Sequence, residues 1–318
     1  MPNVFLTSET IASTGLELLR RELVLPRLVS RLGLADFRGA MDDTVNVRVP
    51  ALLTARDYEW RTRTAPIVID TITETSIPVA LDSHIYSAVG LTDEELTLDI
   101  TDFAVQVLNP QLLAVAEGLE NLVADVIVAA PYDPALTVAY VEDADSAGAP
   151  FHRALVDARK VLNDAKVPMA GRVVVVGSAV EAAALKEEGF RRVNESGSES
   201  ALRDALLGNV AGFTVVASQA VAPDFAVAFH RSAFVLGNVA PEVPAGVTFG
   251  SSQVFDGLAM RWIRDYDPNY LRDRSVVSSF AGAASVDDGP LVDIDGAGPN
   301  PAVATNRRAV LIDFTAAA

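Results

Sequence analysis

The residues that most often carry out catalysis or bind metals are few in this sequence and lie far apart. His84, His152 and His230 have no carboxylate or second histidine at the spacing of a metal site. The chain contains no cysteine, which excludes a disulfide, a thiolate metal site and a thiol nucleophile. The nucleophile motif of serine hydrolases, the zinc-protease motif and the calcium loop are also missing. The sequence therefore predicts no catalytic residue, no metal site and no cofactor.

One predicted strand that is followed by a turn makes an enzyme the second hypothesis for the function of this chain. The apolar run 172–176 is followed by Gly177 and Ser178, as strands are in nucleotide-binding units. The step lacks the G-x-G-x-x-G spacing of a dinucleotide site and the Lys-Ser/Thr pair of a phosphate loop. A small-molecule enzyme with its ligand at this turn is therefore the alternative to a structural function. A nucleotide-dependent rise in melting temperature would favour it.

Two segments mix arginine, acidic and aromatic side chains. The first covers residues 54–64, and the second covers residues 264–274. Arginine suits fixed bidentate ion pairs, and alternating charge signs are typical of contact surfaces rather than catalytic sites. The residues expected at contacts between subunits are Arg56, Tyr58, Trp60, Arg61, Arg63, Arg264, Asp265, Asp267 and Arg272.

Composition restricts the possible partners. The chain has 318 residues, 42 acidic and 25 basic side chains, and a formal charge of −17. Because like charges repel, tight sequence-independent binding to a nucleic-acid backbone is excluded, while a loosely held nucleic-acid cargo is compatible with this charge. No apolar window is long enough to span a bilayer, and the start of the chain does not read as a secretory signal. We expect the protein to fold in the cytoplasm.

A long β-hairpin over residues 42–98 would position the first charged segment. Val45, Val47 and Val49 alternate with polar residues and predict the outgoing strand. Residues 67–73 are expected to return beside it, and a further short strand is expected over 77–81. The tip at 54–64 is too long and too charged for a tight turn, which favours contact with another chain. An ordinary surface hairpin is the alternative.

The remaining elements follow from apolar spacing. Leucines at helical spacing predict an amphipathic arm in residues 1–42. An apolar stripe that begins at Leu112 and stops before Pro131 predicts a long helix. From Phe151 the pattern becomes α/β, with a helix through Leu155 and Leu162. Strands are expected over 172–176, 213–217, 225–230, 247–249, 258–263, 275–281 and 308–314, the first of them buried in the centre of a sheet.

This order of segments resembles the major capsid proteins of tailed double-stranded DNA bacteriophages, which have the Hong Kong 97-type fold. Within that family it is similar to the branch found in phages of actinobacteria. The stretches that carry the likeness are 91–103 (LTDEELTLDITDF), 172–178 (RVVVVGS), 212–218 (GFTVVAS), 229–234 (FHRSAF), and 261–267 ahead of 279–282 (SFAG). Each stretch alone is a generic strand or helix pattern. Their order over nearly the whole chain is the specific feature.

The resemblance implies an α+β capsid fold with five parts. These are an N-terminal arm (1–42), an extended β-hairpin loop (43–85), a peripheral domain (86–150) with a spine helix at 101–130, an α/β axial domain (151–240), and a return to the peripheral domain with a C-terminal strand (241–318). It also implies self-assembly as hexamers and pentamers into the icosahedral shell of a virion. That shell would enclose double-stranded DNA without tight specific binding.

The resemblance further implies scaffolding and portal proteins as partners, together with any decoration proteins, no membrane, and assembly in the host bacterial cytoplasm. Some members join an extended-loop lysine to an asparagine of a neighbour, but residues 43–85 contain no lysine. We therefore expect a shell without covalent links of that type. A bacterial nanocompartment of the encapsulin type, which has the same fold and a protein cargo, is the third hypothesis.

Overall fold

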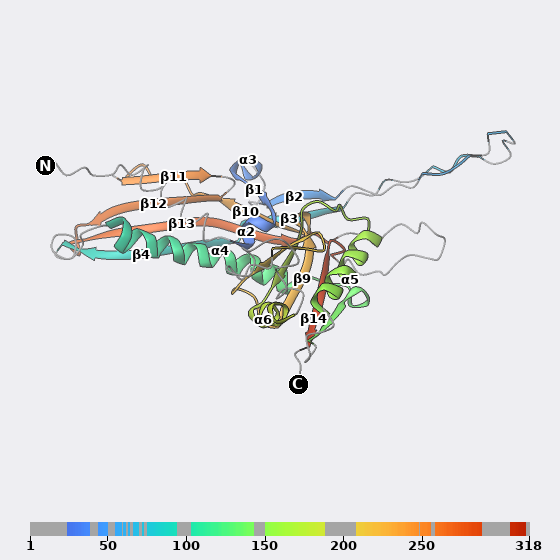
Figure 1. The fold of residues 1–318 in the computed structure, drawn as a ribbon. Coiled ribbons are helices and arrows are strands. Elements are labelled where there is room, and N and C mark those ends of the chain that lie inside the picture. Colours follow the sequence, from blue (N-terminus) through green and yellow to red (C-terminus); the bar gives the residue numbers. More distant parts are fainter. Residues whose placement is uncertain are drawn as a thin grey trace.

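The structure is a computed structural model, and its description covers residues 24–38, 44–49, 55–58, 60, 61, 63, 66–69, 72, 75–93, 103–142, 150–187, 208–247, 249–255, 258–287 and 306–315. Within these residues the chain forms two six-stranded sheets and a separate pair of strands. Figure 1 shows a long-stranded sheet at one end of the molecule and a more compact sheet at the other. No helix in the described ranges has the length and apolar character needed to cross a bilayer.

The first sheet is built on the fourteen-residue strand β13 (Arg272–Ser285). Its order is β1 (Ser30–Leu32), β10 (Phe234–Val239), β13, β12 (Leu258–Asp267) and β11 (Phe249–Phe255), with β4 (Ser83–Thr92) paired to β13. The strands expected at 258–263 and 275–281 are confirmed and are longer than expected. The strand expected at 247–249 begins only at Phe249, and β4 and β10 were not predicted.

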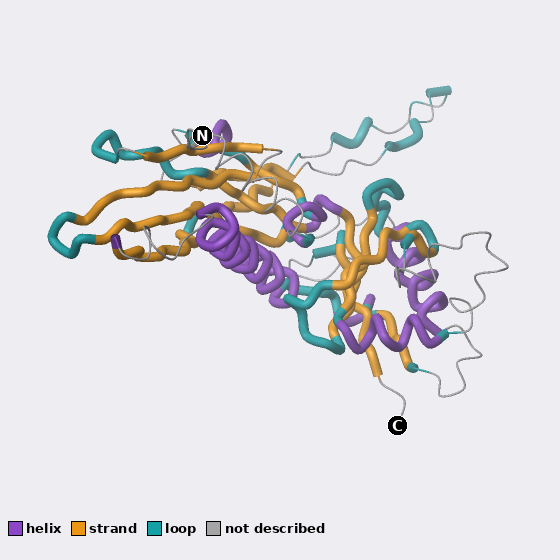
Figure 2. Tube along the Cα trace, turned by 60° about the vertical axis from the view of Figure 1, so that its left-hand side comes forward, coloured by secondary structure: helices purple, strands orange, loops and turns teal. Residues whose placement is uncertain are grey.

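The long helix α4 (Asn109–Ala129) lies along one face of the first sheet (Figure 2). Its apolar stripe, including Leu112, Val115 and Leu119, packs on Met260 and Trp262 of β12. The predicted helix and its end before Pro131 are confirmed. Asn109 continues a helical segment rather than starting one, because the π-helical turn Ala104–Leu108 (η3) precedes it.

A buried glutamine fixes α4 on the sheet. The Gln111 side-chain amide donates to the carbonyl of Ser275 at 2.8 Å and to that of Ser87 at 3.2 Å. The hydroxyl of Ser275 donates back to the Gln111 Oε1 atom at 2.7 Å and accepts from the Trp262 indole at 3.0 Å. Since these groups are buried, a shift of α4 along the sheet would leave several of them without partners.

The second sheet has the order β5 (Val138–Val141), β14 (Ala309–Thr315), β9 (Phe225–His230), β6 (Arg172–Val176), β8 (Phe213–Ala217) and β7 (Asn209–Val210). Helices α5 (Pro150–Asp164) and α6 (Ser178–Lys186) cover one face, where Phe151 and Leu155 pack on Val174. The other face packs Val173 and Val175 against α2 (Leu25–Leu28) and the end of α4. The strand expected at 172–176 is confirmed as buried on both faces.

Strands β10 and β14 each pair with strands that lie far away in the sequence. The C-terminal strand β14 pairs with β9 and β5 in the second sheet, whereas β10 pairs with β13 in the first. The short 3-10 turn η5 (Arg231–Ala233), between β9 and β10, carries the chain from one sheet to the other. The two sheets are therefore each assembled from distant parts of the chain.

The hairpin exists, but its returning strand was placed wrongly. Strand β2 (Thr44–Val49) pairs with β3 (Thr75–Ala80), in register from Thr44 opposite Ala80 to Val49 opposite Thr75. Residues 67–69, expected in the returning strand, form no strand. The pairing with β3 prevails because it puts Val45 and Val47 beside Val79 and Ile77, in one apolar cluster on the first sheet. The predicted N-terminal helix before Val24 lies outside the described residues.

Candidate functional site

The base of the hairpin is firmly packed. Val79 of β3 is fully buried and lies in a cluster with Phe37, Val235, Val239 and Val286. Phe37 comes from the short helix α3 (Leu34–Phe37), and Val235 and Val239 from β10. We call the paired strands β2 and β3, with the loop 50–74 that joins them, the arm. Its base is part of the folded core, so the direction of the arm depends on contacts within this chain.

The described residues of the arm loop lie well clear of both sheets (Figure 1). Four β-branched side chains there are largely exposed: Ile67 (68%), Val68 (63%), Ile69 (85%) and Ile72 (63%). Trp60 is 64% exposed, and the Arg61 guanidinium lies 5.0 Å from its ring centroid. Large apolar side chains gathered on an exposed segment are typical of an interaction surface.

The five predicted contact residues of this loop, Arg56, Tyr58, Trp60, Arg61 and Arg63, are all exposed. The Arg63 side chain donates to the Trp60 carbonyl at 3.1 Å and its backbone has a positive φ of 46°. The tip is thus a local turn around an aromatic residue with arginines beside it. Sequence reasoning missed the exposed run 67–69, because a β-branched run was interpreted as a paired strand. Whether the loop touches another subunit stays a prediction.

The second predicted contact set lies at the opposite end of the molecule, where β12 turns into β13 (Figure 1). There Arg264 donates from its Nε atom to Asp273 at 2.7 Å, and Arg274 pairs with Asp265 at 2.9 Å. Asp267 lies opposite Arg272 in the register. The structure therefore brings Arg264, Asp265, Asp267 and Arg272 together, but it pairs two of them within this chain.

The same turn carries aromatic and aliphatic side chains that sequence reasoning did not single out as contacts. Tyr266, Tyr270 and Leu271 are exposed, and the Arg272 guanidinium lies 4.7 Å from the Tyr270 ring centroid. The ion pairs hold the two strands together, and the apolar groups project from their end. Contact of this turn with another subunit stays a prediction. The intrachain ion pairs are compatible with it but do not depend on it.

The turn at Gly177 and Ser178 has a structural explanation. A Cβ atom on Gly177 would overlap the Ala222 carbonyl oxygen, and the Gly177 N–H donates to the Phe225 carbonyl at 2.8 Å. The glycine therefore allows close packing between the end of β6 and the segment before β9. This close approach explains why residue 177 is glycine, so no ligand is needed to explain it.

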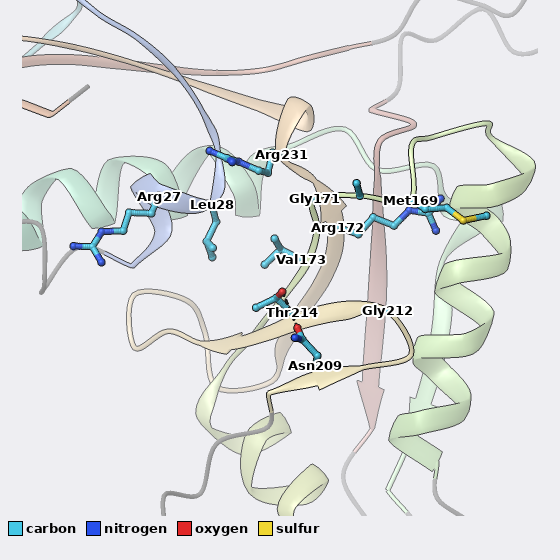
Figure 3. Close-up of a pocket in the computed structure, with 11 residues that line it drawn as sticks. Arg27, Leu28, Met169, Gly171, Arg172, Val173, Asn209, Gly212, Thr214 and Arg231 are labelled. Atoms are coloured by element: carbon cyan, nitrogen blue, oxygen red, sulfur yellow. Dashed lines mark hydrogen bonds between the residues drawn. The ribbon is translucent and has the colours of Figure 1, made fainter. Parts of the chain in front are cut away.

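A pocket of about 530 Å³ lies elsewhere, between α2, the start of β6 and the β7–β8 turn (Figure 3). Arg27, Arg172 and Arg231 line it, but Arg27 and Arg172 extend in opposite directions, so the three guanidinium groups do not point toward a common centre. The Arg172 guanidinium is instead bonded to the carbonyls of Pro168 and Val167, at 2.9 and 2.7 Å. The pocket does not assemble a convergent binding site.

Two of the three histidines, His84 and His230, are held by structural contacts, whereas His152 is exposed. The His84 ring packs on Phe280 with centroids 4.6 Å apart, and the Nδ1 atom of His230 lies 2.9 Å from the Ser232 hydroxyl. Burial, together with neighbouring arginines, lowers the pKa of His230. Among the described residues, no three histidine or acidic side chains gather at a metal-binding distance.

Comparison with known proteins gives one family and many similar folds. A family model described as phage capsid protein matches residues 74–279. The solved structure of Mycobacterium phage Che8 is 20% identical, with a TM-score of 0.61 over 92% of this chain and 91% of that chain. The capsid of the cyanophage P-SCSP1u is 12% identical, with a TM-score of 0.62 over 91% and 87%. Mycobacterium phage Adephagia is 13% identical, with a TM-score of 0.54 over 92% and 89%. No curated protein matches the sequence.

Proposed function

Because this chain belongs to the phage capsid protein family and forms the shell of a tailed phage, we propose that the arm holds a neighbouring subunit in that shell. The fold is the Hong Kong 97-type α+β capsid fold. Family membership makes the chain a structural protein and favours this function over the small-molecule enzyme.

The observation that carries the proposal is the uncovered apolar run of the arm loop. Ile67, Val68 and Ile69 are each more than 60% exposed. Complete burial of one such side chain stabilises a contact by about 1.5–3 kcal/mol, so the run supplies a substantial driving force once a neighbour covers it.

Assembly of a loop variant tests the proposal. In the variant I67T/V68T/I69T the side chains stay β-branched but lose apolar area. We expect the variant to fold as the wild type does, measured by circular dichroism, and to form few or no closed shells in negative-stain electron microscopy. The matched control V128T removes apolar area from the exposed side of α4. Normal shells from the loop variant would contradict the proposal.

We propose in addition that the two sheets correspond to the two domains of the subunit. The first sheet, with α4 as its spine helix, fits the peripheral domain. The second sheet fits the axial domain that meets its copies around the axis of each hexamer or pentamer. In this assignment β5 and β14 join the axial domain and β10 joins the peripheral domain. The order of the strands in the two sheets supports this division.

We also propose the partners that such a shell needs, namely a scaffolding protein, a portal protein and any decoration proteins, with assembly in the host bacterial cytoplasm. The formal charge of −17 supports a wall that encloses double-stranded DNA without binding it tightly. Particles purified from infected cells should contain DNA. Particles filled with a single cargo protein would favour a nanocompartment instead.

A further inference from the structure

Two glycines face each other where the arm meets the first sheet. Gly237 of β10 is paired with Gly282 of β13 in the antiparallel register. Neither glycine ends its strand, and β13 continues past Ala281, where the sequence predicts its end. Glycine weakens the interior of a strand, and a glycine there often marks a close approach of another backbone.

At Gly282 the approaching group is backbone. A Cβ atom there would overlap the Ala80 carbonyl oxygen and lie 2.8 Å from the Ala80 carbonyl carbon and 3.2 Å from the Leu81 Cα atom. Ala80 is the last residue of β3, so the base of the arm packs directly on β13. No rotamer change can relieve an overlap with a carbonyl group.

At Gly237 the approaching groups are side chains. A Cβ atom there would lie 2.6 Å from the Cζ atom of Phe37 and 3.3 Å from a methyl group of Leu81. Phe37 is only 6% exposed and packs with Val79 of the arm and with Val235 and Val239 of β10. The two glycines thus leave a depression in the sheet that Phe37 and the end of β3 fill.

The depression is local. At Gly90, in the neighbouring strand β4, a Cβ atom would meet only the Arg272 side chain at 3.8 Å, which is an ordinary contact. Gly90 is paired with Arg274, toward the other end of β13 from Gly282. A methyl group is therefore accommodated on the same sheet away from the arm and excluded under the arm. We call the depression formed by Gly237 and Gly282 the arm seat.

We propose that the arm seat is a positioning element that fixes the direction in which the arm leaves the sheet. The inference rests on the proposed function only in that it concerns the same arm. β2 and β3 continue beyond the seat into the loop, so a small displacement at Ala80 becomes a larger displacement of the loop. The seat thereby determines which part of a neighbour the loop residues reach.

Distances within one chain test the inference directly. Because the natural chain has no cysteine, spin labels can be attached only at the introduced pair R48C on β2 and D125C on α4. The labelled full-length chain is mixed with an excess of unlabelled chain, so that electron paramagnetic resonance reports distances within subunits. We expect G282A to shift or broaden the distance distribution by several ångströms, and the control G90A to reproduce the unsubstituted distribution. An unchanged distribution in folded G282A would overturn the inference.

A second set of variants applies even if G282A fails to fold. G237A should shift the distribution, because its methyl group collides with the Phe37 ring. The substitution F37L removes the colliding ring atoms while keeping an apolar side chain. We therefore expect F37L to restore the distribution in G237A but not in G282A, where backbone is the obstacle. Absence of rescue in F37L/G237A would overturn the inference.

A measurement of shell assembly distinguishes this inference from the proposed function. If the arm is misdirected and also holds a neighbour, G282A should form fewer or misshapen shells by negative-stain electron microscopy. Shifted distances with normal shells would leave the arm seat in place and count against the arm as an intersubunit contact. Unshifted distances would count against the seat alone.

Discussion

The side-chain amide of Asn306 donates a hydrogen bond to the carbonyl of Ala233 at 2.9 Å. Asn306 is buried just before β14 of the second sheet, and Ala233 lies in the turn that leads into β10 of the first. The same amide donates to the Ser285 hydroxyl at 3.0 Å, and the Asn306 backbone N–H donates to the Pro131 carbonyl at 3.0 Å. The side chain and backbone of this one residue therefore connect both sheets and the segment after α4.

The substitution N306A should destabilise the subunit. It removes the donors to Ala233 and Ser285 and leaves the Ala233 carbonyl buried with one partner fewer. Loss of a partner for a buried polar group costs about 1–3 kcal/mol, and we expect a total loss of about 2–3 kcal/mol in the free energy of unfolding. Urea denaturation of unassembled subunits measures it. N209A, at an exposed residue whose side chain bonds only Thr214 among the contacts described, should cost less than about 0.5 kcal/mol.

The carboxyl group of Glu187 predicts a pH effect. It accepts a hydrogen bond from the Phe151 N–H at 2.6 Å at the start of α5. Burial raises the pKa of Glu187, while the N–H groups of Phe151 and His152 partly oppose the rise. A carboxyl group whose pKa is higher in the folded state holds its proton more tightly there. Its protonation adds stability at low pH, and this stability is lost as pH rises from 4.5 through the folded-state pKa.

The variant E187Q should therefore gain stability relative to the wild type as pH rises through that window and then show a constant difference. Thermal unfolding of unassembled subunits at a series of pH values measures the difference. D157N removes one exposed carboxylate from α5, the helix whose first turn donates to Glu187, and serves as the control. A difference between E187Q and wild type that does not vary with pH would contradict the argument.

Charge reversal at the arm tip should impair assembly without unfolding the subunit. Arg61 and Arg63 are exposed, so the double variant R61E/R63E costs little stability, within about 0.5 kcal/mol. If the tip pairs with acidic groups of a neighbour, the variant should form fewer shells, measured by sedimentation. The double variant R61K/R63K keeps the charge and should retain more assembly. Normal shells from R61E/R63E would contradict a contact at the tip and favour an ordinary surface hairpin.

Mature particles should dissociate fully in boiling detergent. Residues 43–85 contain no lysine, and the chain contains no cysteine. Neither a lysine–asparagine link from the arm nor a disulfide can therefore join subunits. We expect a single band at the subunit mass of 33.6 kDa on a denaturing gel. A ladder of multimers would require another covalent link.

The elements that the sequence predicted well are those with a complete local pattern. The apolar stripe of α4 and the continuous valines of β6 are each sufficient to specify a helix and a buried strand, because side-chain periodicity depends only on neighbours in the chain. The weakest prediction was the returning strand of the arm. Residues 67–69 have the composition of a strand, but strand propensity depends on the surface available for packing. In this fold Val79 and Ile77 occupy that surface.

The sequence by itself determined the chemistry that this protein lacks and the order of its segments. No cysteine, no arm lysine and no catalytic motif are properties of composition and spacing. Tertiary structure alone decided which strand pairs with β2, which sheet contains β10 and β14, and which acidic side chains Arg264 and Arg274 meet. It also decided that Gly237 and Gly282 lie opposite each other under the arm. These relationships join residues distant in the chain, so they depend on how all buried surfaces fit together rather than on any local pattern.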